Sequence, residues 1–233
     1  TQIDFEMSFV ESEDIMNFVE GMYKHVFEKV LKVKLKKFVR LTYEEAMKKY
    51  GTDKPDLRTN KNDPNEFAFC WIYDYPLFHY NKDDKRWEPE HHMFSSPQKK
   101  YLDVLEKDPG KVKGDLFDVV LNGVELGSGS IRVNNSELQA KIMKVIGMSK
   151  QEARKKFGFL LDAYEYGGPV HGGMGLGFDR LVALMLGYSD IREVIAFPKN
   201  KAAQNPMDGS PSEIDKRQLK ETHIDVVEKK KGK

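Results

Sequence analysis

The stretch HGGMGLGFDR, residues 171–180, places glycines at 172, 173, 175 and 177, directly before the apolar run LVALML. Glycines at alternate positions leave one face of a strand without side chains, so that a flat group can lie against the backbone. The apolar run predicts a helix over about 178–186, ended by Gly187, and its first turn would offer unpaired N–H groups to an anion. This spacing therefore predicts a nucleotide site at a strand-to-helix junction.

The spacing also tells which nucleotide motifs this site is not. A dinucleotide-binding turn needs Gly-x-Gly-x-x-Gly after a parallel strand, whereas this chain has Gly-x-Gly-x-Gly. A phosphate loop needs Gly-Lys-Ser/Thr, which the stretch lacks. Arg180 would add a planar cation that can stack on a base or bond a phosphate. On spacing alone, a glycine-rich strand packed tightly under a helix, with Arg180 merely exposed, explains the pattern equally well.

The remaining pattern favours an α+β fold, with a mainly antiparallel β-sheet flanked by helices. Residues 2–9 alternate polar and apolar side chains, as a half-buried strand does. Residues 117–121 and 123–133 predict two strands joined at Asn122–Gly123, a hairpin signal. Several strands follow one another without a crossover helix, which disfavours a parallel sheet. Further strands are expected at 67–75, 77–80, 86–88 and 194–197. Polar connections are expected at 52–66 and 96–114, and a further connection with a short strand at 32–37. Helices are expected to begin at the N-caps Ser12, Thr42 and Ser149, to span 136–147, and to follow the segment 212–215.

Composition narrows the functional class only slightly. The formal net charge of +1 neither demands nor excludes a nucleic-acid partner. No apolar run approaches the ~18 residues of a membrane span, and we expect a cytoplasmic protein without a membrane partner. The single cysteine, Cys70, rules out an internal disulfide and fits a reducing compartment. It lies in an apolar strand, where we expect an inert thiol rather than a nucleophile. The tail EKKKGK is expected to be solvated.

The Gly-x-Gly-x-Gly-x-Asp-Arg run before an apolar helix resembles motif 3 of the class II aminoacyl-tRNA synthetases. Further segments are similar to the bacterial-type aspartyl-tRNA synthetases within that family, and they follow in the same order over nearly the whole chain. The resemblance implies the class II synthetase catalytic fold. The matching segments are TQIDFEMSF, LTYEEAM with YGTDKPDLR, WIYDYPLF, EPEHHMFSSP, DVVLNGVELGSGSIR, KFGFLLDAYEYGGPVHGG, and IREVIAFPKN with PSEIDKRQLKETHI.

Two carboxylates beside the predicted hairpin are candidate metal ligands. Asp118 and Glu125 flank the Asn122–Gly123 turn, and Mg²⁺ prefers a few carboxylates together with phosphate oxygens. Surface acids beside a turn would give the same pattern. The resemblance implies that both hold Mg²⁺ and that Asp118, Glu125 and Arg180 form the catalytic set. It implies ATP binding by Glu125, Gly177, Phe178, Asp179 and Arg180, although Asp179 is equally typical of an acid at a helix N-terminus.

A second group of residues is implied in binding L-aspartate. Arg132 follows a run of small residues, and a guanidinium there suits bidentate recognition of a carboxylate, although strand arginines are often surface ion-pair partners. The resemblance implies that Arg132 grips the side-chain carboxylate of the substrate. His91 and His92 would point to opposite faces if they lie on a strand, and no Cys or His cluster accompanies them, so we do not expect zinc.

The resemblance implies that His91 and His92 belong to the aspartate site, with His91 facing the substrate. The family commonly has Pro-Phe-Thr after the pair, whereas this chain has residues 93–95 as MFS. Three polar residues of the first strand match the second strand of motif 2, where the polar face lines the amino-acid pocket. They are Gln2, Asp4 and Glu6, with Asp4 placed to meet the α-ammonium group; plain solvent exposure is the alternative.

The reaction that the resemblance implies is that of an aspartate–tRNA ligase. ATP activates L-aspartate to aspartyl-adenylate, and the aspartyl group then moves to the 3′ end of tRNA(Asp), with tRNA(Asn) open as a second acceptor. The attacking carboxylate is already ionised at pH 7, so no general base is needed. Two alternatives stay open: a class II paralogue, either asparaginyl or a tRNA-independent amino-acid-activating enzyme, and a non-catalytic truncated paralogue that serves as a binding module.

Residues 1–233 are expected to be the C-terminal portion of the catalytic domain, from the second strand of motif 2 through motif 3 and a C-terminal extension. The motif 2 arginine, the anticodon-binding domain and motif 1, which forms the homodimer interface of the full-length protein, would precede Thr1. Only a short run separates Arg58 from Trp71, so the bacterial insertion domain is expected to be absent. We expect this chain alone to make no adenylate.

Overall fold

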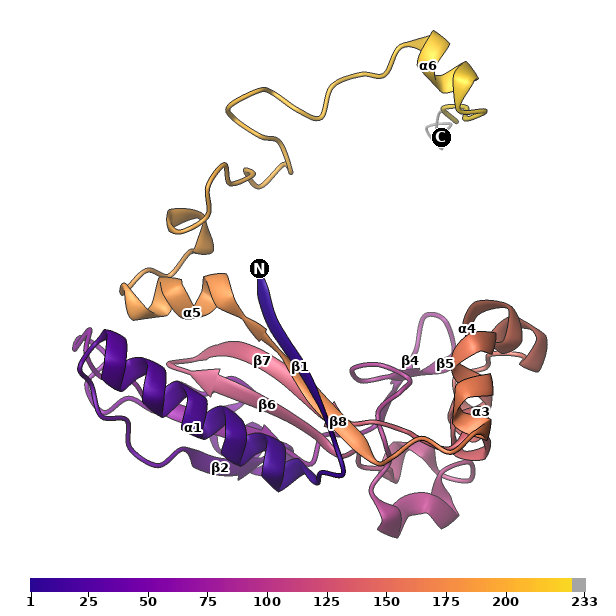
Figure 1. Cartoon of the computed structure of the whole chain (residues 1–233), viewed down its shortest axis with the longest axis horizontal. Helices are drawn as coiled ribbons and strands as arrows, with labels where there is room; N and C mark the ends of the chain where they lie inside the picture. The colour runs from indigo at the N-terminus through magenta and orange to yellow at the C-terminus, as the bar shows by residue number, and fades with distance from the viewer. Residues whose placement is uncertain (228–233) are drawn as a thin grey trace.

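A six-stranded sheet forms the centre of the computed structural model, which describes residues 1–227 (Figure 1). The strand order is β1-β8-β7-β6-β3-β2, and every neighbouring pair is antiparallel except β2 with β3. The expected α+β fold with a mainly antiparallel sheet is therefore confirmed. The strands are β1 (Gln2–Ser8), β2 (Val39–Thr42), β3 (Phe69–Tyr73), β6 (Leu116–Leu121), β7 (Val124–Ile131) and β8 (His171–Gly177), with β4 (Phe78–Asn81) and β5 (Arg86–Pro89) as a separate hairpin.

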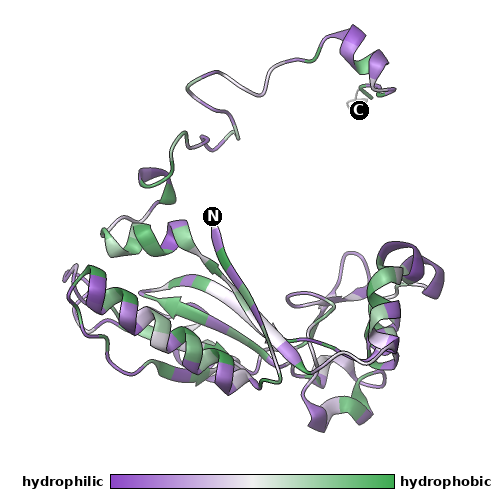
Figure 2. Cartoon of the chain, viewed as in Figure 1, coloured by the Kyte–Doolittle hydropathy of each residue, from purple (hydrophilic) through white to green (hydrophobic). Residues whose placement is uncertain are grey.

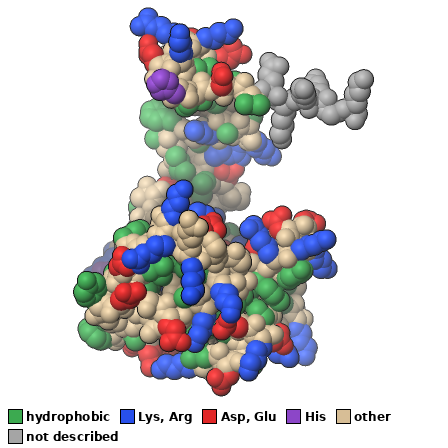
Figure 3. Space-filling view, turned by 90° about the vertical axis from the view of Figure 1, so that its right-hand side faces the viewer, with side chains coloured by type: hydrophobic (Ala, Val, Ile, Leu, Met, Phe, Trp, Pro, Cys, Tyr) green, Lys and Arg blue, Asp and Glu red, His purple; other side chains and the backbone are tan. Residues whose placement is uncertain are grey.

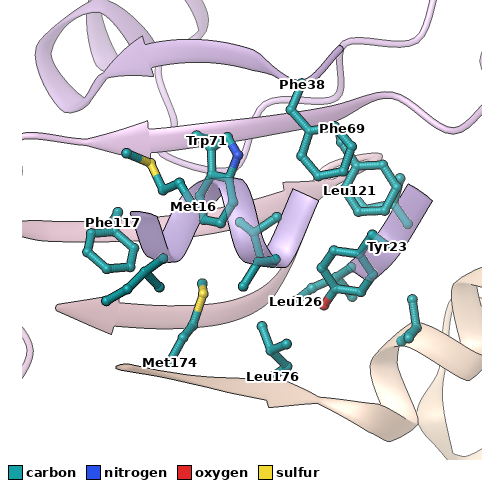
Figure 4. Packing of buried hydrophobic residues seen from close by; sticks show 14 of the residues in the cluster. Met16, Tyr23, Phe38, Phe69, Trp71, Phe117, Leu121, Leu126, Met174 and Leu176 are labelled. Atoms are coloured by element: carbon teal, nitrogen blue, oxygen red, sulfur yellow. The ribbon is translucent and has the colours of Figure 1, made fainter. Parts of the chain in front are cut away.

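Helix α1 (Ser12–Val30) covers one face of this sheet and builds the larger core against it (Figure 4). Its buried residues recur at helical spacing and meet aromatic and aliphatic side chains from β3, β6, β7 and β8. Figure 2 shows β6 mostly in green, in keeping with the burial of all its residues. The other helices are α2 (Tyr43–Tyr50), α3 (Ser136–Val145), α4 (Lys150–Glu165), α5 (Phe178–Met185) and α6 (Lys216–Glu221), with 3₁₀ turns at Lys99–Val104, Pro109–Lys111 and Ile191–Glu193.

Local capping signals begin most of the helices. The Thr42–Glu45 capping box opens α2, and Gly51 ends it at φ 69°. Ser149 accepts a hydrogen bond from the Glu152 amide at the start of α4, as the sequence predicts. The expectation that Ser12 caps α1 is wrong by one residue, because Glu11 is the N-cap and forms a reciprocal capping box with Asp14.

The predicted hairpin turn at Asn122–Gly123 is confirmed. Both residues take left-handed backbone conformations, with φ 52° and 85°, which suit the twist of antiparallel strands. A β-bulge follows in β7, because Val119 pairs with Gly127 whereas Val120 pairs with Glu125. Leu126 is the extra residue, and it is buried in the core under α1.

Several sequence predictions are wrong. No strand forms at 194–197: the segment pairs with neither sheet, and Phe197 is 66% exposed with φ 57°. The short strand expected within 32–37 lies instead at β2. Residues 96–114 contain two 3₁₀ turns rather than only loop. The last helix starts after Asp215, its N-cap, rather than at Ser212. The predicted solvated tail, 228–233, lies outside the described residues.

The C-terminal part beyond α5 runs away from the sheet in Figure 1. On the face in Figure 3, acidic and basic side chains are interspersed rather than gathered by sign. Helices α3 and α4 likewise carry acidic and basic residues side by side, which form ion pairs such as Lys141 with Glu137 and Lys156 with Glu152. Among residues 1–227, no helix combines the length and the apolarity that a bilayer crossing requires.

Candidate active site

The candidate site residues gather on the sheet face opposite α1. Asp118 on β6 lies across from Ser128 on β7. In a regular strand, Glu125 and Ser128 would point to opposite faces, since side chains alternate. The bulge at Leu126 removes this conflict, so Glu125 and Ser128 both line one cavity while Leu126 is buried in the core. The two carboxylates that the sequence singles out therefore share a face.

A cavity of about 390 Å³ lies at the junction of β8 and α5, where the sequence predicts a nucleotide site. Arg180 in the first turn of α5 donates from Nη1 to the Glu125 carbonyl at 2.8 Å, and the same nitrogen lies 3.8 Å from Glu125 Oε1. Asp179 and Phe178 lie beside Arg180 in the first turn of α5, and Phe178 is 42% exposed. The lining residues are Thr1, Gln2, Glu125, Leu126, Gly127, Ser128, Gly175, Gly177, Asp179, Arg180 and Ile191.

A second cavity, of about 310 Å³, adjoins the first through Ser128, which lines both. Its other lining residues are His91, His92, Leu116, Gly129 and Arg132. A third cavity, also of about 310 Å³, is lined by Arg132 as well, together with Glu6 of β1 and Leu160 and Tyr164 of α4. Arg132 therefore lines both the second and the third cavity, and its side chain is only 18% exposed.

The Arg132 guanidinium is held by three side chains. Its Nε donates to Glu6 Oε1 at 2.7 Å and its Nη1 to Ser130 Oγ at 2.7 Å, and Nη1 also contacts His92 Nε2. Since a guanidinium can only donate, His92 Nε2 must be the acceptor and His92 must be neutral. Its Nδ1 then carries the proton and faces Ser95 Oγ at 3.3 Å. A chain from buried Ser95 through His92 thus orients the cation.

Burial lowers the pKa of His92 to about 4, and the charges of Arg132 and His91 add to this effect. Because the folded-state pKa lies below the unfolded value near 6.5, the contribution of His92 to stability is complete above pH 6.5 and is lost as the pH falls towards 4. We expect the free energy of unfolding of His92→Gln to fall less steeply over this window than that of the unmodified chain.

The measurement is urea unfolding at half-unit steps between pH 4 and 7. His25→Gln is the control, since His25 lies on the exposed side of α1, and it should keep the slope of the unmodified chain. Equal slopes for both variants would contradict the neutral, accepting role of His92.

The two histidines contact different residues, as expected, but not because they alternate along a strand. The pair lies in a bend after β5 and not on a strand, so that part of the prediction is wrong. His92 contacts Arg132, whereas His91 Nε2 lies 3.3 Å from Asp118 Oδ1. Burial lowers the pKa of His91, but the hydrogen bond and the charge of Asp118 together outweigh burial and raise it. The assignment of His91 to the substrate aspartate stays a prediction.

Sequence reasoning missed Tyr75, which donates its hydroxyl to Asp118 Oδ2 at 2.9 Å. Both side chains are buried, with Tyr75 2% and Asp118 3% exposed. Burial raises the pKa of Tyr75, and the Asp118 charge raises it further, so this hydroxyl remains a donor. The available signal was the second tyrosine of WIYDY, which could not be told apart from the other aromatic residues of the predicted strand.

The polar face of β1 follows the glycines of β8. Gln2 lies across from Gly177, Asp4 from Gly175 and Glu6 from Gly173. Gln2 lines the cavity at the junction of β8 and α5 and Glu6 holds Arg132, while Asp4 lies exposed between them. The glycine face is therefore only partly bare: a Cβ at Gly173 would lie 2.0 Å from Glu6 Oε2.

Among residues 1–227, no three His, Cys, Asp or Glu side chains form a cluster that could hold a metal ion. Asp118 and Glu125 are a smaller set, and hard carboxylate oxygens on one face fit Mg²⁺ when substrate phosphates complete the shell. Cys70 is buried in β3, and burial raises the pKa of its thiol to about 12, which leaves a poor nucleophile at neutral pH.

The comparisons with known proteins agree with this geometry. Residues 1–201 match tRNA synthetases class II (D, K and N), and the chain belongs to this family. It is 35% identical to the aspartate–tRNA(Asp/Asn) ligase of Treponema denticola and 34% identical to that of Borreliella burgdorferi, with 98% of this chain and 60% of each relative covered. The chain thus spans about three fifths of the curated relatives it matches.

Solved structures share the fold. An aspartyl-tRNA synthetase of Entamoeba histolytica superposes with a TM-score of 0.63 at 21% identity over 88% of this chain and 44% of that one. The asparaginyl-tRNA synthetase of the same organism, in complex with asparaginyl-adenylate, gives 0.64 at 21% identity over 88% of this chain and 48% of that one. The class II synthetase fold is therefore confirmed.

Proposed function

We propose that this chain is the amino-acid-activating part of an aspartate–tRNA ligase. It would bind L-aspartate and ATP, form aspartyl-adenylate with release of pyrophosphate, and transfer the aspartyl group to the 3′ end of tRNA(Asp). The names of the relatives leave tRNA(Asn) as a second acceptor. The family membership and these names support the proposal, and we extend it to residue roles from the site.

The observation that carries the proposal is the pair of adjoining cavities that share Ser128. One cavity is lined by Arg132, which contacts Glu6 and His92. The other lies where the glycine-rich strand β8 meets the start of α5. An amino acid held by its side-chain carboxylate at Arg132 would direct its α-carboxylate towards the nucleotide cavity. Adenylation requires this juxtaposition.

The chemistry needs positioning rather than proton transfer. The aspartate α-carboxylate is ionised at neutral pH and attacks the α-phosphorus of ATP in line, and the bond to pyrophosphate breaks. Arg180 would neutralise charge on the phosphates, and Gly177, Phe178 and Asp179 would form the edge of the nucleotide site. Asp118 and Glu125 would hold Mg²⁺, which supplies charge neutralisation of the phosphates. Gln2 and Asp4 would meet the substrate amine, and His91 would lie beside the substrate.

The domain organisation is also a proposal. The alignment with the Treponema denticola relative runs over 354 residues, although this chain has 233, so the relative holds residues inside the match that have no counterpart here. This supports the absence of an inserted domain, which we place between Arg58 and Trp71 by resemblance to the family. We propose that motif 1, which would form a homodimer interface, and the anticodon-binding domain belong to the full-length protein and not to residues 1–233.

The test is ATP–pyrophosphate exchange with a panel of amino acids, in which aspartate alone is expected to support exchange in the full-length protein. We expect no exchange from residues 1–233 alone. Exchange driven by asparagine would favour the asparaginyl paralogue. Calorimetry of ATP with and without Mg²⁺ separates the remaining alternative, because a non-catalytic binding module would lack nucleotide affinity.

A further inference from the structure

A lysine outside the residues assigned above reaches the same carboxylate as Arg180. Lys54 lies in the connection between α2 and β3, and its Nζ is 2.9 Å from Glu125 Oε2. The Arg180 guanidinium lies 3.8 Å from the other oxygen, Oε1. Glu125 is therefore flanked by two cations at the edge of the nucleotide cavity.

The backbone, rather than a flexible side chain alone, brings Lys54 to this place. Arg58 binds the Asp56 carboxylate in a fork, from Nε at 3.0 Å and Nη2 at 2.8 Å, which stiffens the connection. The connection also packs on the hairpin turn: a Cβ at Gly123 would lie 3.3 Å from Asp56 Cβ, and Pro55 is buried. The fold thus places the backbone of Lys54 near Glu125, while its side chain, 44% exposed, can turn.

The contact between Lys54 and Glu125 affects the charge balance of the site. Asp118 and Glu125 carry two negative charges, and Lys54 and Arg180 carry two positive ones, so the ligand-free set is neutral. A divalent cation that binds Glu125 must compete with the Lys54 ammonium group for the same oxygens. The complex of Mg²⁺ with ATP carries net negative charge, however, and a nearby ammonium group attracts it.

We infer that Lys54 is a charge-exchange residue of the nucleotide site: its ammonium group neutralises Glu125 in the ligand-free chain and turns to the triphosphate when a divalent cation takes the carboxylate. This inference rests on the proposed function, since it requires the cavity to bind a nucleotide. It predicts that removing the charge has opposite effects on two ligands. The free cation gains affinity, whereas the metal–nucleotide complex loses affinity.

The experiment compares Lys54→Met with Lys54→Arg and with Lys61→Met, a matched control. Lys61 lies on the same connection and is 65% exposed, and it lies 3.9 Å from Asp56 rather than near Glu125. Binding of Mn²⁺ alone is measured by electron paramagnetic resonance, and binding of MgATP by calorimetry. Because the pair is partly exposed, we expect about 3- to 5-fold tighter Mn²⁺ and about 3- to 5-fold weaker MgATP for Lys54→Met.

Lys54→Arg and Lys61→Met should bind both ligands as the unmodified chain does. Affinities of Lys54→Met that change in the same direction for both ligands, or do not change, would overturn the role of Lys54 while leaving the proposed function intact. All variants are made in the full-length protein, and its failure to bind MgATP when unmodified would instead overturn the proposed function, and the role of Lys54 with it.

Discussion

In the full-length protein, Arg132→Met is expected to lower kcat/KM for aspartate about 10²- to 10³-fold in ATP–pyrophosphate exchange. The loss corresponds to about 3–4 kcal/mol, because the proposed charge-assisted contact would disappear and the substrate carboxylate would enter a largely buried site without a partner. Arg132→Lys should recover little of it, since an ammonium group cannot reproduce the fork that now spans Glu6, Ser130 and His92. Where exchange is too slow, calorimetry with L-aspartate gives the same comparison.

Arg40→Met is the matched control for this loss. Arg40 is also ion-paired and of similar exposure, 23% against 18%, but it pairs with Glu13 on the side of α1, away from the cavities. It should leave the kinetics unchanged. Arg132 should also matter more for aspartate than for asparagine, because only aspartate presents a charged side-chain oxygen. Equal losses for the two amino acids would remove Arg132 from side-chain recognition.

Gly173→Ala is expected to destabilise the chain by more than about 3 kcal/mol. Its Cβ would lie 2.1 Å from the Phe5 carbonyl as well as 2.0 Å from Glu6 Oε2, so the β1–β8 pair would have to separate. Gly175→Ala is the control two residues along the same strand. Its Cβ would approach only the Gln2 side chain, at 3.3 Å, which can move.

Thermal unfolding followed by circular dichroism measures the difference. At about 2–4 °C per kcal/mol for a chain of this size, Gly173→Ala should lower Tm by at least about 6 °C, while Gly175→Ala should stay within a few degrees. Similar midpoints for the two variants would contradict the argument that Gly173 is needed for the close approach of β1 to β8.

Local sequence signals predicted the elements that depend on local chemistry. The Asn122–Gly123 turn and the Thr42–Glu45 box each specify a conformation through their own residues, and both form as predicted. The parallel pairing of β2 with β3 could not be predicted, because strand partners are chosen by contacts distant in sequence. The strand expected at 194–197 fails for the same reason, since it has no neighbour to pair with.

The candidate site shows the same division. The resemblance to the class II synthetases, rather than spacing alone, pointed to Asp118, Glu125, Arg132 and Arg180. The structure brings the first three to one side of the sheet, with Arg180 at the start of α5 beside Glu125. The sequence could not reveal the contacts that orient them. Tyr75 looked like any aromatic strand residue, and Lys54 like any lysine in a polar connection, because their roles depend on partners 43 and 71 positions away.

The bulge at Leu126 gives one residue of β7 a role that its neighbours do not share. Leu126 is the extra residue, so deleting it would leave Val119 opposite Gly127 and Val120 opposite Glu125, and Glu125 and Ser128 would still share a face. What the deletion would remove is an apolar side chain from the core under α1, which should lower the free energy of unfolding by about 2–5 kcal/mol, as the loss of a buried leucine does. A single-codon deletion at this point should therefore act as a core mutation and leave the facing of Glu125 and Ser128 in place.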